Sequence, residues 1–353
     1  MQKPAIYEDR GMNRRRAIKG GYQLQADGTI GFRLGPHDDK AKIVVDPSLS
    51  VAYSTFLGGT GEDVANSIAL DSTGKIYIGG TTTSITSFPE SGSVRVGPAG
   101  ATTEFFVAKI DPTASGLNSL VYLTFLGGSG NQAGGLIAVD SIGDVALTGT
   151  TTSADFPVTD GSKRTTGPND MVVTEIGPTG GTLTYSTLFG GSGAESTVAA
   201  GGIALDTSGN IFITSDTNSK DLTTTTGAYQ VAYGGGSTDG FLAEFLPLVT
   251  PHLEYCTYLG IDALVGIGGV AIDAGNNAYV AGFTSDPGTS FSTMNGFQSV
   301  YGGGSFDAFL MKIYPSGTGA ADLACRSIIR PIWAALSLTR DWALSRRRPM
   351  KSM

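Results

Sequence analysis

The sequence of 353 residues has few of the side chains on which enzyme sites and disulfide scaffolds depend. It contains two cysteines and two histidines, and charged residues make up only 15% of it. Two cysteines cannot build a disulfide framework. No apolar run reaches the length of a membrane-spanning helix, and the polar, basic N-terminus shows no signal peptide. We therefore expect a domain without a disulfide network and without membrane insertion.

Glycine, in contrast, is abundant. The chain has 52 glycines, and 40% of its residues are hydrophobic. That hydrophobic fraction is too high for a disordered chain, and frequent glycine suits an all-β protein with many tight turns. Residues 51–317 hold seven Lys and Arg against 23 Asp and Glu. Because so acidic a surface repels phosphate backbones, we expect no nucleic-acid partner.

A heptapeptide, which we call the opener, recurs along the chain. It reads Tyr-Ser-Thr-Phe-Leu-Gly-Gly at residues 53–59 and returns with substitutions at 122–128, 185–191 and 255–260. Successive copies begin 69, 63 and 70 residues apart. A period of this size indicates a repeat architecture.

Two further motifs keep the same period. An apolar strand that ends in aspartate, such as Ile68-Ala-Leu-Asp71, is followed by a short turn and a second apolar strand, such as Ile76-Tyr-Ile78. A third strand, rich in aromatic and aliphatic residues, occupies residues 105–110, 171–176, 240–245 and 308–313.

The turn between the first two strands has recognisable chemistry. Aspartates open the four turns at Asp71, Asp140, Asp206 and Asp273. The left-handed position is assigned to Gly74, Gly143, Gly209 and Asn276. Asp accepts backbone hydrogen bonds as a turn opens, and Gly or Asn tolerates the left-handed conformation that closes a bulged hairpin. The alternative role of the aspartates is calcium ligation, which needs more carboxylates per loop than these turns carry.

Four short strands per period predict an all-β fold, a β-propeller of four-stranded antiparallel blades. Residues 51–317 would form four blades, which either close a ring alone or belong to a larger one. The first two strands of each blade are expected nearest the axis, and aromatic residues such as Phe105, Phe106 and Phe309 are expected between blades. A parallel β-helix is the alternative, but its coils are shorter and lack antiparallel hairpins.

These motifs resemble the SBBP repeat, a bacterial β-propeller repeat family. The resemblance rests on the opener, the Ile-Ala-Leu-Asp-x-x-Gly hairpin, the exit Gly79-Gly-Thr-Thr82, the Phe-Pro pairs at 88–89 and 156–157, and the Ala-Phe-Leu-x-Lys-Ile strand. It covers roughly residues 51 to 317, although the third and fourth copies lack the Phe-Pro pair. The resemblance implies repeats of large secreted or surface proteins and no catalytic residue set.

The two ends of the chain do not follow the repeat. Residues 1–50 resemble the C-terminal part of a β-rich domain that often precedes such repeats, with a basic arm as the alternative. Residues 318–353 are basic and lack the glycine pattern. Permitted codons for residues 328–335, read from the third base, spell another opener, which predicts an out-of-frame tail on a fragment of a longer protein. The alternative is a genuine basic amphipathic tail. The nucleotide sequence of the gene would distinguish an out-of-frame tail from a genuine one.

Candidate catalytic residues are few. His37 and His252 are expected in solvated loops and have no metal-ligand partner at a useful spacing. Cys256 replaces Ser54 of the opener and is expected to pack rather than to attack a substrate. Aspartates that recur near strand ends could hydrolyse glycans as paired carboxylates, and they are Asp63, Asp170, Asp239 and Asp307. Asn131 and Ala194 interrupt the pattern around Asp63.

We therefore predict a non-catalytic, secreted or cell-surface propeller scaffold without a cofactor, whose loops contact an unidentified protein or glycan. One alternative is a calcium-stabilised propeller that binds or hydrolyses carbohydrate. Another is a non-functional fragment of a larger surface protein. The expected location is extracellular or at the cell surface, although this chain carries no visible signal peptide.

Overall fold

The structure is a computed structural model, and it describes most of the chain. The described residues are 4–9, 14–25, 29–46, 51–89, 94–98, 101–196, 201–250, 252–260, 262–285 and 296–314. They form two compact units, Met1–Phe56 and Leu57–Met353. Within the described residues the single helix is the 3-10 turn η1 (Gly116–Ser119), and no helix is long and apolar enough to cross a membrane. The predicted out-of-frame tail lies outside them.

The first unit contains a small sheet and a separate hairpin. The sheet has the order β2-β1-β5 and its strands are β1 (Ala5–Asp9), β2 (Arg15–Ala17) and β5 (Lys42–Asp46). The hairpin pairs β3 (Gly20–Leu24) with β4 (Ile30–Leu34). Glu8 is buried in the sheet, where its Oε1 accepts the backbone N–H of Asp38 at 2.8 Å.

The second unit is built from four consecutive sheets, which we call sheets 1 to 4. Sheet 1 contains β6 (Asp63–Leu70), β7 (Ile76–Thr82), β8 (Val94–Val96), β9 (Glu104–Ile110) and β10 (Leu120–Leu126). Sheet 2 contains β11 (Gln132–Val139), β12 (Val145–Thr151), β13 (Asp170–Ile176) and β14 (Leu183–Phe189). Sheet 3 contains β15 (Gly202–Leu205), β16 (Ile211–Thr217), β17 (Asp239–Phe245) and β18 (Leu253–Leu259). Sheet 4 contains β19 (Val265–Ile272), β20 (Ala278–Thr284) and β21 (Asp307–Ile313).

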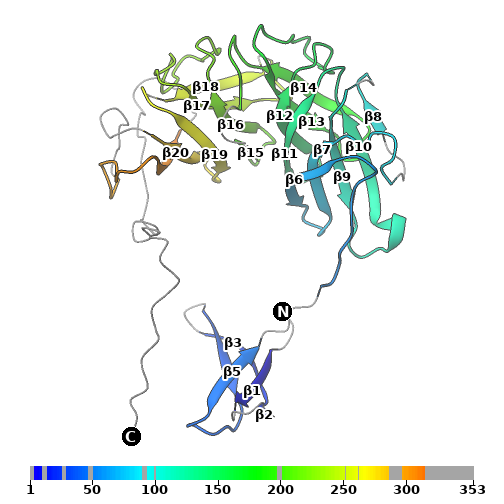
Figure 1. Cartoon of the computed structure of the whole chain (residues 1–353), viewed down its shortest axis with the longest axis vertical. Helices are drawn as coiled ribbons and strands as arrows, with labels where there is room; N and C mark the ends of the chain where they lie inside the picture. Colours follow the sequence, from blue (N-terminus) through cyan, green and yellow to red (C-terminus); the bar gives the residue numbers. More distant parts are fainter. Residues whose placement is uncertain are drawn as a thin grey trace, which may run out of the picture. The chain divides into compact units, whose positions relative to one another are not determined.

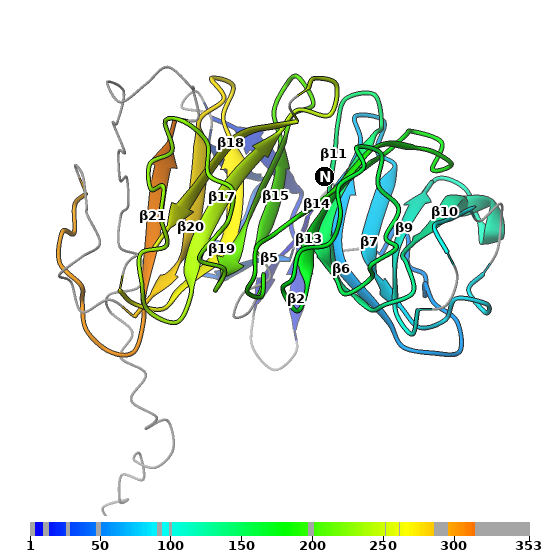
Figure 2. The same cartoon turned by 90° about the horizontal axis from the view of Figure 1, so that it is seen from above.

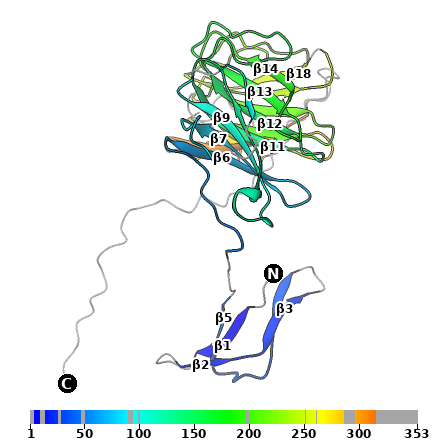
Figure 3. The ribbon, with the colours of Figure 1, turned by 90° about the vertical axis from the view of Figure 1, so that its right-hand side faces the viewer.

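The sheets follow one another along an arc (Figure 1). Their first strands β6, β11, β15 and β19 lie on the inside of the arc, and β14 and β18 lie on the outside. In sheet 1 the short strand β8 pairs in parallel with the outer side of β10. Figure 2 shows the four sheets standing side by side, and Figure 3 shows the successive strands β6, β7 and β9 of sheet 1. Four-stranded antiparallel sheets in sequence around an axis are the blades of a β-propeller, so the predicted fold class is confirmed.

The strands of one sheet come from two sequence repeats, which corrects the predicted unit. The opener at residues 122–128 supplies β10, the outermost main strand of sheet 1, where Tyr122 pairs with Lys109. The next two openers supply β14 and β18 in the same way. The opener therefore belongs to the blade before its own repeat, and the opener at 53–59 lies in no strand of the described chain.

The hydrophobic core lies between neighbouring sheets. Phe105 and Tyr77 of sheet 1 pack in one cluster with Leu147 and Val172 of sheet 2, as expected for Phe105. Glycine lets the inner strands of neighbouring sheets lie close to one another. A Cβ on Gly79 of β7 would lie only 2.5 Å from Cγ2 of Ile137 on β11 of the next sheet. Equivalent clusters join sheets 2 and 3 and sheets 3 and 4. Each inner sheet is therefore stabilised from both faces.

Candidate functional site

The predicted aspartate turns all lie at the same end of the sheets, which we call the turn end. The turn of β6 and β7 and the turn after β9 are joined there by an ion pair between Lys75 and Asp111. Within the first turn, Oδ1 of Asp71 accepts the backbone N–H groups of Thr73 at 2.9 Å and Lys75 at 3.0 Å. The hydroxyl of Thr73 adds a third bond at 2.6 Å. These bonds, led by that hydroxyl, lower the pKa of Asp71 to about 2.

The other three turns repeat this geometry. Their aspartates, Asp140, Asp206 and Asp273, accept the backbone N–H four residues later at 2.8, 2.9 and 3.0 Å. The φ angles of the left-handed positions are 81° at Gly74, 93° at Gly143, 84° at Gly209 and 58° at Asn276. A side chain with a Cβ other than Asn or Asp rarely adopts such angles, so the turn sequence and the backbone agree.

Calcium ligation by these aspartates stays a prediction. One carboxylate oxygen of each turn is already engaged by backbone N–H groups. Across the described ranges, no group of three or more His, Cys, Asp or Glu side chains is arranged to hold a metal ion. Calcium takes six to eight oxygen ligands, which a turn of this kind does not assemble.

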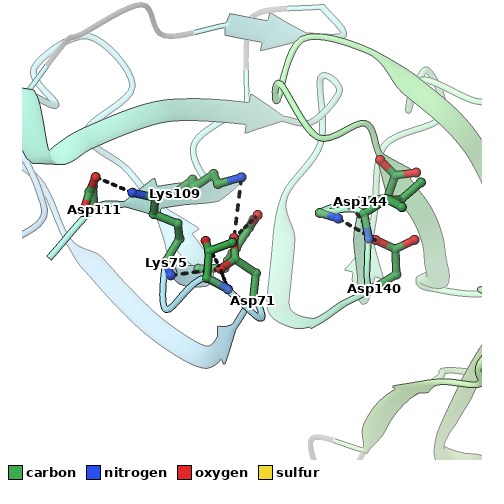
Figure 4. A network of polar contacts seen from close by, with 10 residues as sticks. Asp71, Lys75, Lys109, Asp111, Asp140 and Asp144 are labelled. Atoms are coloured by element: carbon green, nitrogen blue, oxygen red, sulfur yellow. Dashed lines mark hydrogen bonds and ion pairs between the residues drawn. The ribbon is translucent and has the colours of Figure 1, made fainter. Parts of the chain in front are cut away.

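Around the first turn, charged side chains form a polar network (Figure 4) that Tyr77 extends. The hydroxyl of Tyr77 donates to Oδ2 of Asp71 at 3.2 Å, and Nζ of Lys109 lies 3.9 Å from the same oxygen. That Nζ also lies 4.8 Å from the centre of the Tyr77 ring. Burial, together with the charge of Asp71, raises the pKa of Tyr77, so its phenol stays protonated.

Sheet 4 repeats this trio and sheets 2 and 3 replace it. Asp273 accepts from the Tyr279 hydroxyl at 3.0 Å and from Nζ of Lys312 at 3.3 Å. In the lysine position, sheets 2 and 3 carry Glu175 and Glu244. Burial and then the charge of Asp206 raise the pKa of Glu244 to about 7. Lysine thus faces the turn aspartate on the end sheets, whereas a glutamate whose pKa is raised takes its position on sheet 3.

At the opposite end, which we call the loop end, a hydrogen-bonded clamp recurs that the motifs did not reveal. After the first three openers, three successive backbone N–H groups donate to side chains that follow the second strand of the next sheet. For residues 129–131, the acceptors are Asp155 at 2.7 Å, Ser153 at 2.9 Å and Thr152 at 2.8 Å. Residues 192–194 use Asp221, Ser219 and Asn218, and residues 60–62 use Ser87, Ser84 and Thr83. In the sequence, the clamp is marked by Gly-Ser/Thr-Gly before the first strand of a sheet and by Thr-x-Ser at the end of the second strand.

The strand-end aspartates belong to two positions rather than one, which corrects their predicted alignment. Asp63 opens β6, and Gln132 and Glu195 are its equivalents, so Asn131 and Ala194 belong one residue earlier. Asp63 accepts from Ser84 at 2.8 Å, and Gln132 accepts from Ser153 at 3.0 Å. The remaining aspartates, Asp170, Asp239 and Asp307, open the third strands. The set therefore does not form one ring of equivalent aspartates.

The other candidate residues are involved in local packing. Burial raises the pKa of the Cys256 thiol in β18 to about 12, which leaves it protonated. His252 differs from the solvated histidine expected there, because its ring packs 4.8 Å from that of Tyr185. Nδ1 of His252 lies 2.9 Å from the carbonyl of Leu246, and Nδ1 of His37 lies 2.8 Å from the carbonyl of Gly35.

Comparison with known proteins gives one informative match. No curated protein matches the chain. A solved structure of a glucose dehydrogenase is 13% identical, with 80% of this chain and 93% of that chain covered. Its TM-score of 0.21 is too low to indicate a shared structure. The SBBP family model, described as a beta-propeller repeat, matches residues 52–89 and 184–223. These segments contain two openers and two aspartate hairpins, and the chain therefore carries SBBP repeats folded as β-propeller blades.

Proposed function

We propose that this chain is a non-catalytic propeller scaffold whose loop end presents polar surface to a protein or glycan ligand. The observation that supports it most is the repeated clamp between residues 60–62, 129–131 and 192–194 and the loops that follow the second strands. Each clamp holds exposed loop backbone in a fixed conformation. Ordering a surface before it binds lowers the entropy that binding costs.

The acids with raised pKa values support a scaffold over a hydrolase. Burial raises the pKa of Glu195 and Glu244 to about 7 and that of Asp239 to about 6, a range suited to a general acid. Glu195 and Asp239 are fully buried, and Glu244 is nearly so. A glycosidase acid has to reach the glycosidic oxygen, so these carboxyls suit a structural role.

A binding screen tests the proposal. The chain is applied to a glycan array and to a panel of cell-surface proteins, together with the clamp variant Asp155→Ala/Asp221→Ala. Lys75→Ala, at the turn end, is the matched control. We expect a ligand whose affinity falls at least tenfold in the clamp variant and is unchanged in the control. Release of reducing sugar from an array glycan, or binding that only the turn-end variant weakens, would contradict the proposal.

We further propose that the scaffold acts outside the cell or on its surface. The support is what the resemblance to the SBBP repeat implies, namely repeats of secreted and surface proteins, together with the acidic composition of residues 51–317. Protease treatment of intact cells that express the full gene should remove the chain, whereas a cytosolic marker survives. Protection of the chain until the cells are lysed would overturn this location.

A further inference from the structure

Sheet 4 has one strand fewer than its neighbours in the described chain. In sheets 1 to 3 the outer edge of the third strand is paired with an opener. In sheet 4 the corresponding strand, β21, pairs with β20 alone among the described strands. A free strand edge is a template for another extended segment.

The opener at residues 53–59 is anchored like the others but pairs with no described strand. Its last glycine donates its N–H to Oδ2 of Asp63 at 2.8 Å, and the clamp of Thr60 and Gly61 holds it against sheet 1. In the later copies, the same anchorage lets the opener run as the outer strand of the sheet before. Here Phe56 is fully exposed at 102%. The segment is thus placed to join a sheet that precedes β6.

The outward faces of sheets 1 and 4 also lack the cover that inner sheets have. Ile68 of β6 is 69% exposed, whereas its equivalent Ile137 is 5% exposed between two sheets. At the other end of the arc, Ala308 of β21 is exposed, although its equivalent Phe105 is fully buried. Apolar residues of both end faces are those that elsewhere pack sheet against sheet.

We propose that the opener of one copy, residues 53–59, adds to β21 of a second copy as the missing outer strand of its sheet 4. Sheet 1 of the first copy then packs against sheet 4 of the second. The opener leads directly into sheet 1, whereas β21 stands at the far end of the arc with sheets 2 and 3 between them (Figure 2). Two copies together hold eight blades, which is within the usual range of closed propellers.

The pairing register follows from the three openers already in place. Tyr122, Tyr185 and Tyr255 stand opposite the residue before the last of the third strand. The same register sets Tyr53 opposite Lys312 and Thr55 opposite Leu310. Successive backbone N–H groups of a strand point to opposite neighbours in the sheet. The N–H groups of Cys256 and Tyr258 donate to the loop outside β18. The N–H of Thr257, between them, therefore points towards β17. The equivalent N–H of Thr55 therefore faces β21.

The loop beside β21 retains the features that receive an opener elsewhere. In sheet 3, Gln230 lies along β18 and its Oε1 accepts the N–H of Gly260 at 3.0 Å. Its Nε2 donates to the carbonyl of Ala232 at 2.8 Å. Gln298 makes the same internal bond, to the carbonyl of Val300 at 3.0 Å. Gly58 of the first copy would occupy, beside Gln298 of the second copy, the place that Gly260 has in sheet 3.

Directed cross-linking tests the pairing in the full chain. In a Cys325→Ser background, Thr55→Cys chains are mixed with Leu310→Cys chains under mild oxidation. We expect a covalent pair of two different chains. The register control mixes Thr55→Cys with Met311→Cys, which lies one residue away and faces the opposite side of the sheet, and should give at least tenfold less product. Equal yields from both mixtures, or no product, would overturn the proposal.

Particle mass separates pairing between copies from closure within one chain. By light scattering, the unmodified chain should contain two or more copies. Thr55→Pro removes the N–H that faces β21 and should give single chains, whereas Thr55→Val keeps the N–H and should assemble normally. A single-chain mass for the unmodified protein, with an internal cross-link in Thr55→Cys/Leu310→Cys at high dilution, would contradict a second copy as the occupant.

Discussion

The inner sheets 2 and 3 and the end sheets 1 and 4 repeat one pattern in different surroundings. Ile213 of sheet 3 and Ile78 of sheet 1 stand at the same position of the second strand, yet Ile213 is fully buried and Ile78 is half-buried. The second and third strands of the two sheets otherwise pair in the same register. The difference teaches that a repeat specifies its own sheet, whereas its stability depends on the sheets beside it.

The largest expected effect comes from charging the shared isoleucine position. Ile213→Asp places an unpaired carboxylate in the cluster between sheets 2 and 3 and should cost more than about 4 kcal/mol of unfolding free energy. Ile78→Asp, in a Thr55→Pro background that keeps chains single, should cost less than about 2 kcal/mol, since water reaches this face. Urea denaturation measures both. Equal losses would show that end and inner sheets are not distinct.

The next largest expected effect is a pH dependence of stability caused by Glu195, a buried acid beside inner sheet 3. Burial, with a contribution from Asp170, raises the pKa of Glu195 from 4.5 to about 7, although Ser219, Thr217 and the N–H of Gly191 lower it. The folded state therefore favours the protonated acid. The contribution of this protonation to the free energy of unfolding is fully present below about pH 4.5, and it is lost as the pH rises through about 7.

Glu195→Gln isolates this titration, because Gln132 already fills the equivalent position of sheet 2. The variant should be more stable than the unmodified chain at pH 8 by roughly 3 kcal/mol and about equally stable at pH 4. Asp239 and Glu244 also have raised pKa values, so both proteins keep the pH dependence of stability that these two groups cause. Urea midpoints at the two pH values measure the difference, and a constant offset would refute protonation of Glu195.

A smaller effect is expected from an inner turn. Asp206→Ala removes the acceptor of the Ser208 and Asn210 N–H groups and should lower the free energy of unfolding by about 1.5–3 kcal/mol. Asp206→Asn keeps one carbonyl acceptor and should cost less. Thermal melting of the pair is the measurement. If both variants melt alike, the backbone bonds to the carboxylate do not stabilise the turn.

The smallest expected effect is that of calcium. Because the turn aspartates already accept backbone N–H groups, adding calcium after treatment with a chelator should leave the melting temperature unchanged within error. A reproducible upward shift that Asp71→Asn/Asp140→Asn abolishes would restore the calcium-stabilised propeller as a candidate.

Much of the fold could be predicted from the sequence, because turn chemistry and strand alternation are local. The four aspartate turns and their left-handed residues could be located from neighbouring residues alone. Which sheet an opener joins is a non-local choice, and nothing within residues 122–128 distinguishes the preceding sheet from the next one. The clamps were missed for the same reason, since Ser129 and Asp155 meet only after two strands have paired.

Assignment of the opener to the preceding blade is the claim on which the account depends, and an experimental structure of the chain tests it most directly. The account predicts that residues 122–126, 185–189 and 255–259 each form the outer strand beside β9, β13 and β17. Openers found paired with the sheet of their own repeat, or a helix in any of these segments, would contradict it.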